Sequence, residues 1–253
     1  MSKKVILLSS IMGILTTVGL LAVSFFPLWW TLGSVFTVWT LAFFFVHYFV
    51  YSFPEKWEEL ILAILFALSS LTLVSILDFP LFRFLVAVVC GIGMGMLFHT
   101  DGKNLSVHRF KPRRRMLMML WMFSAYAFTS FIFALAMFFQ GFWFWLASIL
   151  IALFYGCAFM VIWRMYFAVE YKNLLLWSLL SSCMLWELIW VVHLLPYGYL
   201  VSGFFVVWVA YIIQLFLRFH LSKVGLVWKK QIPFLITNAI LYILVLMFFV
   251  RWV

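Results

Sequence analysis

Nine long apolar runs constrain the fold of this chain more than any other feature of its sequence. They lie at about residues 5–25, 28–52, 57–77, 80–100, 116–139, 142–163, 174–195, 199–219 and 234–250. A helix needs roughly 20 mostly apolar residues to cross the hydrocarbon core of a bilayer, and each run is about that long. We therefore predict nine transmembrane helices.

Composition leaves little room for anything outside these helices. Of the 253 residues, 68% are hydrophobic and 9% are charged, whereas about a quarter of the residues of a soluble domain are charged. Nine spans of roughly 20 residues use most of the chain, so no separate catalytic or binding domain fits beside them. We predict an all-α, polytopic transmembrane helix bundle that forms one domain over residues 1–253, with the lipid bilayer as its solvent.

The joints between the runs alternate between tight and long. Tight joints occur at residues 26–27, 78–79, 140–141 and 196–198, and the joints between them are longer and charged. This rhythm predicts four helical hairpins followed by a ninth helix. Asp78 lies two residues before Pro80 and is predicted to cap the helix that follows, because a carboxylate there can accept amide hydrogens of the first turn.

The basic residues assign a direction to the bundle. With the tight joints outside, 15 of the 17 Lys and Arg residues lie inside, and only Arg83 and Arg251 lie outside. Lys and Arg collect in the cytoplasmic loops of membrane proteins. We predict that the N-terminus is inside and the C-terminus outside, in the cell (cytoplasmic) membrane. This topology explains the net charge of +10 without a nucleic-acid partner.

A shift of 112 residues aligns the first three predicted helices with the fifth, sixth and seventh. Glu58 then falls on Glu170, and residues 68–70 (Leu-Ser-Ser) fall on residues 180–182, which have the same sequence. Repeats with an even number of helices share one orientation in the membrane. We predict a parallel 4+4 repeat with halves at residues 1–100 and 115–220 and an extra helix at 234–250. The alternative is coincidence, because Leu and Ser are common in membrane helices.

Glu187 is the only carboxylate well inside a predicted helix. An ionised carboxylate is costly in hydrocarbon unless it is protonated or paired, so an intramembrane acid is a candidate functional residue. As a neutral acid Glu187 could carry protons, and as an anion it would need a cationic partner. The structural alternative is a hydrogen bond between helices in the interior of the bundle.

Two more polar residues complete the candidate intramembrane site. His193 is six residues after Glu187 and lies 120° around the helix from it, so we expect it at the outer membrane surface rather than in a pair with Glu187. Arg83 breaks the inside pattern of positive charge. Its side chain could extend to the headgroups, or it could form a bridge to Glu187, which is the sharpest structural prediction from the sequence.

The longest loop carries a cluster of basic residues beside the membrane. These residues are Lys103, Arg109, Lys111, Arg113, Arg114 and Arg115. Each Lys or Arg at such a surface attracts anionic lipid by about 1 kcal/mol. We predict a surface for anionic lipid headgroups here, although topology alone also explains the charges.

The sequence predicts neither a metal site nor a cofactor. Cys90, Cys157 and Cys183 lie in apolar segments and form no CxxC pair, and the chain has no HExxH motif and no phosphate-binding glycine loop. A lipid-modifying intramembrane enzyme would need more than Glu187, His193 and Arg83, so the sequence leans against an enzyme.

The segment from Trp186 to Tyr199, Trp-Glu-Leu-Ile-Trp-Val-Val-His-Leu-Leu-Pro-Tyr-Gly-Tyr, carries a resemblance together with the helix that follows it. It resembles uncharacterised multi-pass membrane proteins of bacteria with reduced genomes, over the C-terminal third of the chain. The resemblance implies a membrane location and a helical fold and no known reaction.

Two classes of function fit these observations. Compact hairpins, the predicted repeat and Glu187 favour a small transporter or permease, or a protein that supports the membrane envelope. The small number of polar residues along any path through the bundle favours the alternative, a non-transporting membrane scaffold or assembly factor. The lipid-modifying enzyme is the third choice.

Overall fold

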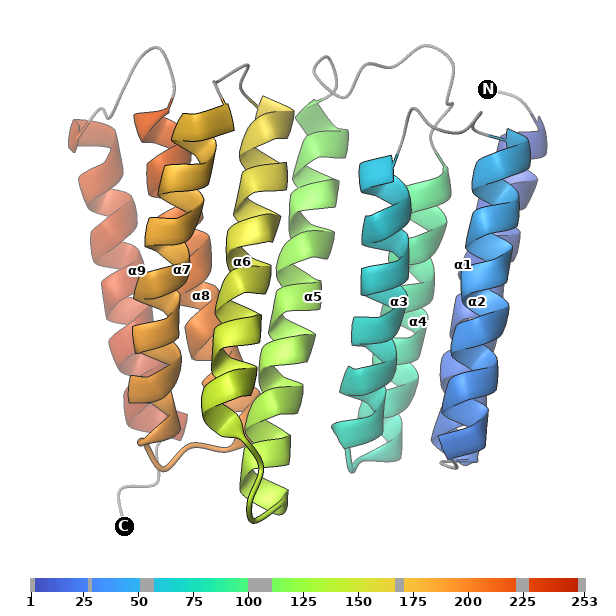
Figure 1. Cartoon of the computed structure of the whole chain (residues 1–253), viewed down its shortest axis with the longest axis horizontal. Helices are drawn as coiled ribbons and strands as arrows, with labels where there is room; N and C mark the ends of the chain where they lie inside the picture. Colours follow the sequence, from blue (N-terminus) through green and yellow to red (C-terminus); the bar gives the residue numbers. More distant parts are fainter. Residues whose placement is uncertain are drawn as a thin grey trace. The chain divides into compact units, whose positions relative to one another are not determined.

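The computed structural model describes residues 3–26, 29–50, 57–99, 111–166, 171–221 and 228–249, and within these ranges the chain forms nine α-helices and no strand (Figure 1). The predicted all-α, polytopic fold is confirmed. The helices are α1 (Lys3–Phe25), α2 (Trp29–Val50), α3 (Trp57–Ile76), α4 (Pro80–Phe98), α5 (Lys111–Phe138), α6 (Phe144–Tyr166), α7 (Tyr171–His193), α8 (Tyr199–His220) and α9 (Trp228–Phe249).

Seven of the helices in the described ranges are long and apolar enough to cross a membrane. The other two, α2 and α9, carry shorter apolar stretches at Trp30–Val46 and Gln231–Val245. A chain with this many apolar helices is an integral membrane protein with multiple passes.

The chain divides into two compact units, Met1–Phe128 and Thr129–Val253. The boundary falls inside α5, so this helix contributes to both units and no loop separates them. The predicted repeat halves have different limits, and the repeat stays a prediction.

In the first unit, α1 packs most extensively on α4. The two backbones approach closely where Gly13 and Gly95 meet Gly91 and Ser9. A Cβ atom added at Gly91 would lie 2.8 Å from the Gly13 carbonyl oxygen and would also collide with the Thr17 hydroxyl. Small residues allow such close packing in lipid, where van der Waals contact drives the association of helices.

In the second unit, α7 packs on both α6 and α8. Gly156 of α6 lies against Ser178 and Ser182 of α7, and the Ser178 hydroxyl donates a hydrogen bond of 2.7 Å to the Gly156 carbonyl oxygen. Gly203 of α8 lies against Ser130 of α5, where an added Cβ atom would be 3.0 Å from the Ser130 amide nitrogen. These glycines let hydroxyl-bearing helices come close together.

The two close approaches have matching positions in the sequence. Gly91 and Gly203 are 112 residues apart, the shift of the predicted repeat, and the hydroxyl residues they meet, Thr17 and Ser130, are 113 residues apart. Each unit therefore has a glycine on its fourth helix in contact with a hydroxyl side chain on its first. This correspondence adds an observation to the repeat hypothesis.

The tight joints show how the chain reverses. Gly141 adopts a φ of 89° in the turn between α5 and α6, a left-handed conformation that favours glycine. Before α4, the N-cap position is Phe79 and no side chain caps the helix, so the predicted capping role of Asp78 is wrong. Pro80 starts α4 instead, because its fixed φ suits the first helical turn and its missing N–H needs no partner there.

Candidate functional site

Glu187 lies on the exposed side of α7 and not in the interior of its unit. The buried side of α7 is formed by Leu174, Ser178, Ser181, Ser182, Leu185, Ile189 and Val192. At 100° per residue, Glu187 is about 200° around the helix from Leu185, almost opposite the buried side. It is six residues, or about 9 Å, from the end of α7 at His193, so its carboxyl group is within the apolar span.

The residues around Glu187 on this side are almost all apolar. Leu176, Leu180 and Val191 are 65%, 49% and 56% exposed, and Cys183 is also exposed. We call these four residues, together with Glu187, the exposed stripe of α7. From Leu176 to Glu187 its members are 4, 3 and 4 residues apart, which is the spacing of a seam between two packed helices.

The buried side of α7 meets its hydrogen-bonding needs without Glu187. Ser181 donates to the carbonyl oxygen of Trp177 at 2.7 Å, and Ser182 donates to that of Ser178 at 3.0 Å. Ser178 donates across to α6, as described above. The interior of the unit therefore gives Glu187 no role as a hydrogen-bond bridge between these helices.

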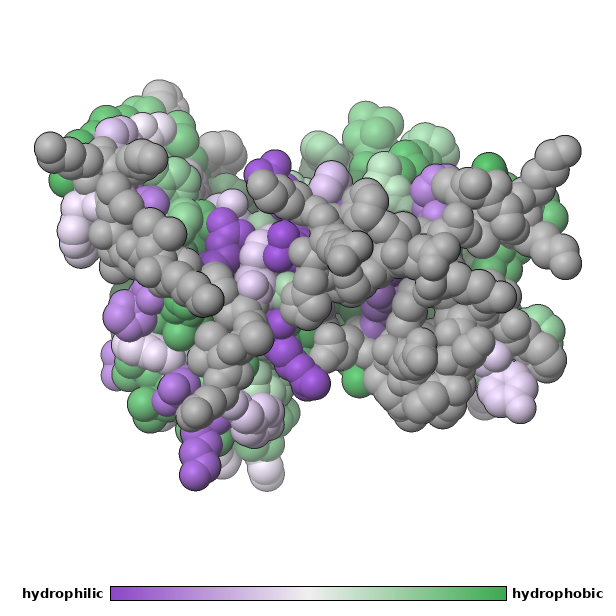
Figure 2. Space-filling model, turned by 90° about the horizontal axis from the view of Figure 1, so that it is seen from above, coloured by the Kyte–Doolittle hydropathy of each residue, from purple (hydrophilic) through white to green (hydrophobic). Residues whose placement is uncertain are grey.

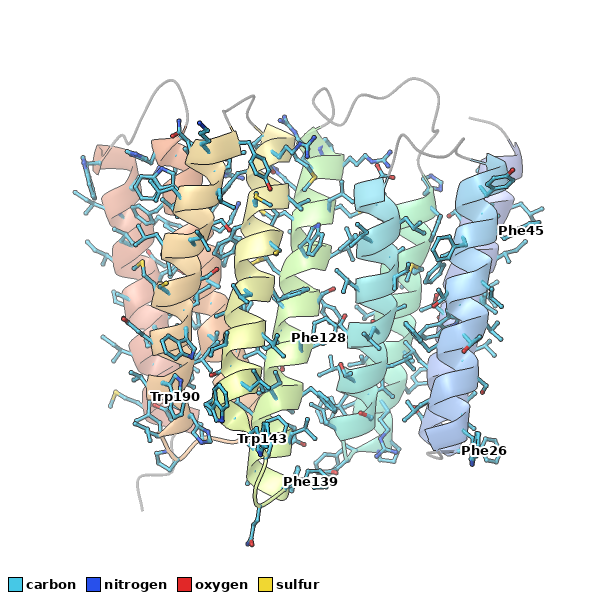
Figure 3. The ribbon with its side chains drawn as sticks, viewed as in Figure 1. Phe26, Phe45, Phe128, Phe139, Trp143 and Trp190 are labelled. Atoms are coloured by element: carbon cyan, nitrogen blue, oxygen red, sulfur yellow. The ribbon has the colours of Figure 1, made fainter. Side chains whose placement is uncertain are left out.

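His193 joins a cluster of aromatic rings at the end of α7. Its imidazole stacks on the ring of Phe144 with centroids 3.8 Å apart, and Phe133 and Trp190 lie 6.3 and 6.4 Å away. Figure 3 shows Trp190 and Trp143 at the same end of their unit, beside the turn that holds Phe139. Aromatic rings with polar edges settle at the border between headgroups and hydrocarbon. Such a setting fits the expectation that His193 lies at the membrane surface.

Arg83 binds the backbone of its own unit. Its Nε donates to the carbonyl oxygen of Leu77, just after α3, and its Nη1 lies 3.5 Å from that of Ser24 in the last turn of α1. Positive charge is favourable at the C-terminal ends of helices, where carbonyl groups lack helical partners. Arg83 thereby ties α1 and α3 to α4. Glu187 belongs to the other unit, and the bridge between the two residues stays a prediction.

The predicted lipid-binding cluster is only partly within the described residues. Lys103 and Arg109 lie outside the described residues, as does the side chain of Lys111. Arg115 is exposed and Arg114 is half-buried, at an end of α5 where hydrophilic side chains are visible in Figure 2. A surface for lipid headgroups can therefore be built on Arg115 and Arg114.

Arg113, by contrast, is buried and belongs to an ion pair. Its Nη2 lies 2.6 Å from Oε2 of Glu59, and the two side chains are 5% and 17% exposed. The pair fixes the start of α5 to the first turn of α3. Sequence reasoning assigned Arg113 to the lipid surface and Glu59 to the helix dipole, and it missed their pairing.

Gln214 is a polar residue that the sequence reasoning passed over. It is fully buried in α8, and neither its amide nitrogen nor its amide oxygen has a hydrogen-bond partner among the described residues. Buried polar groups without partners are rare and costly. A glutamine inside a predicted apolar run was the available signal.

Metal chemistry finds no support in the part of the chain that the structure describes, where no three His, Cys, Asp or Glu residues are grouped closely enough to hold an ion. Comparisons of the chain with protein-family models, curated proteins and solved structures gave no match. Proposals about function therefore depend on the residues of this chain.

Proposed function

We propose that this protein is a non-transporting scaffold or assembly factor of the cell membrane, and that it acts by packing α7 against another membrane helix. The observation that carries this proposal is the position of Glu187 on the exposed side of α7, within the apolar span. A carboxyl group facing hydrocarbon is costly, and acidic residues in membrane spans normally face protein or water. A partner helix removes that cost by supplying a hydrogen bond and excluding lipid.

The interior of the second unit supports the same choice over transport. Large side chains fill it, including Tyr155, Phe159, Trp163 and Phe205, each of which is fully buried. The hydroxyl of Tyr155 is paired with that of Thr129 at 3.0 Å. A path for a polar solute needs polar groups or water along it, whereas the described interior is mainly aromatic and aliphatic.

Transport is the second candidate, and Gln214 is the observation that favours it. Its unpaired amide, together with the Ser130 hydroxyl, which is also buried without a partner among the described residues, gives the interior of the second unit two polar groups that a solute or water could satisfy. The basic residues Arg114 and Arg115 are proposed to hold anionic lipid headgroups in either case.

Carbodiimide labelling of Glu187 tests the scaffold proposal. A hydrophobic carbodiimide attacks protonated carboxyl groups exposed to lipid, and mass spectrometry then locates the adduct. We expect Glu187 to be shielded in native membranes and to become reactive after extraction into detergent. The control is Leu150→Glu, at a position on α6 that is 59% exposed, where an uncovered carboxyl should react in both settings.

Proton flux into proteoliposomes separates the two candidates. The scaffold proposal predicts equal flux with the wild-type chain and with Glu187→Gln and Gln214→Leu. Equal labelling of Glu187 and the introduced Leu150→Glu carboxyl in native membranes would refute the scaffold. A flux that either substitution abolishes would favour transport.

A further inference from the structure

We infer that the helix that covers the exposed stripe of α7 is α7 of a second copy of this chain, with the two Glu187 side chains sharing one proton across a two-fold axis. This inference rests on the proposed function and names its partner. It draws on the direction of α7 in the membrane, the spacing of the stripe and the hydrogen-bonding chemistry of a carboxyl pair.

Symmetry makes a second copy a good match in depth. Two copies inserted with the same topology have parallel α7 helices, and a two-fold axis along the membrane normal places each residue of a shared face opposite the same residue of the partner. Glu187 therefore meets the partner's Glu187 at the same distance from the helix end, and Cys183 meets the partner's Cys183 one turn away. An unrelated helix would need a polar group at this one depth by chance.

The carboxyl pair supplies its own complementarity. When one of two adjacent carboxyl groups is protonated, its O–H donates to the ionised one, because two negative charges at this distance cannot both persist. The pair then carries one negative charge in place of two and fills the hydrogen-bonding needs of both residues. A neutral side chain opposite Glu187 would leave part of that need unmet.

The rest of the stripe suits a parallel seam between helices. A spacing of 4, 3 and 4 residues repeats along one face of two helices that cross at a small angle. Leu176, Leu180 and Val191 provide apolar contact on either side of Glu187, and Cys183 is small enough to let the helices approach. A single polar residue in such a seam fixes the register of the two helices.

Oxidative cross-linking tests the dimer directly with a natural cysteine. In Cys90→Ala/Cys157→Ala, Cys183 is the single thiol, and a membrane-permeant oxidant should produce a species of twice the 29.9 kDa chain mass. The matched control keeps only Cys157, which is exposed on α6, and should stay monomeric. A second pair of variants in a cysteine-free background places the thiol on the stripe with Leu180→Cys or off it with Leu175→Cys. Only the Leu180→Cys variant should cross-link.

Substitution of Glu187 measures the contribution of the carboxyl pair. Glu187→Gln retains a donor and an acceptor and should keep the dimer, whereas Glu187→Leu should raise the dissociation constant of the dimer roughly 3- to 20-fold, the range for one polar contact between membrane helices. Dissociation is followed by energy transfer between labelled chains diluted into lipid. A dimer that Glu187→Leu leaves equally tight would overturn the shared proton.

The outcomes distinguish this inference from the proposed function. If neither stripe thiol cross-links while Glu187 is shielded from the carbodiimide in native membranes, a different protein covers the stripe, and the scaffold stands without the dimer. If Cys157 cross-links as well as Cys183, the chains meet by random collision and the dimer is refuted. If Glu187 is freely labelled, both proposals fail.

Discussion

Gly91→Ala should weaken the first unit by forcing α1 and α4 apart. The new Cβ atom would lie 2.8 Å from the Gly13 carbonyl oxygen, which belongs to the backbone and cannot rotate away. Normal contacts of carbon are about 3.5 Å or longer, so the helices must separate by roughly 0.7 Å. Overpacking of this kind costs about 1–3 kcal/mol.

Gly33→Ala provides the matched control for this substitution. Gly33 is also inside a helix, α2, and a Cβ atom there would meet nothing within 4 Å. Both variants gain about 0.5–1 kcal/mol from the better helix propensity of alanine. The difference between the two free energies of unfolding therefore isolates the steric cost and should be about 1–3 kcal/mol.

Unfolding by sodium dodecyl sulfate in mixed micelles, followed by tryptophan fluorescence, measures this difference. Thr17→Ala removes the hydroxyl that also meets the new methyl group, so adding it to Gly91→Ala should recover part of the loss and leave the backbone contact. Equal stability of Gly91→Ala and Gly33→Ala, within about 0.5 kcal/mol, would contradict the close approach of α1 and α4.

Two other contacts give predictions of the same kind. Arg113→Met should lower the free energy of unfolding by about 3 kcal/mol, because it leaves Glu59 without its partner in a largely buried pair, whereas Arg115→Met at an exposed position should change it by less than about 0.5 kcal/mol; equal effects in the same unfolding assay would refute a stabilising role for the pair. Asn238→Leu removes the acceptor for Trp208 Nε1, 2.9 Å away, and should speed hydrogen exchange of the α9 amides by the roughly 3- to 20-fold expected for one interhelical bond while the α6 amides are unchanged; unaltered exchange in α9 would show that this bond does not hold α9 to α8.

The helices could be predicted from the sequence because length and apolarity are local properties. The predicted run at residues 80–100 agrees with α4 (Pro80–Phe98) within two residues. α5 begins at Lys111, five residues before the predicted start at 116, because its first turn is basic and was counted as loop. The pairing of Arg113 with Glu59 extends that helix into the charged segment.

The contacts of the candidate site could not be predicted in the same way. Arg113 and Glu59 are 54 residues apart, and no local pattern connects them. The face of α7 that carries Glu187 was also hidden, because a membrane helix presents apolar residues to lipid and to protein alike. Leu180 is 49% exposed and Leu185 is fully buried, yet both are leucines. Periodicity of hydrophobic residues separates inside from outside in water and loses that power in lipid.

The link between Arg113 and Glu59 has a consequence for how the chain is made. The ribosome adds Arg113 54 residues after Glu59, a delay of about 3–11 s at 5–20 residues per second. During that interval α3 and α4 leave the ribosome while the acidic start of α3 still lacks its cation. The first unit can therefore reach its final packing only after synthesis has passed into the fifth helix, so insertion of the early helices precedes their locking.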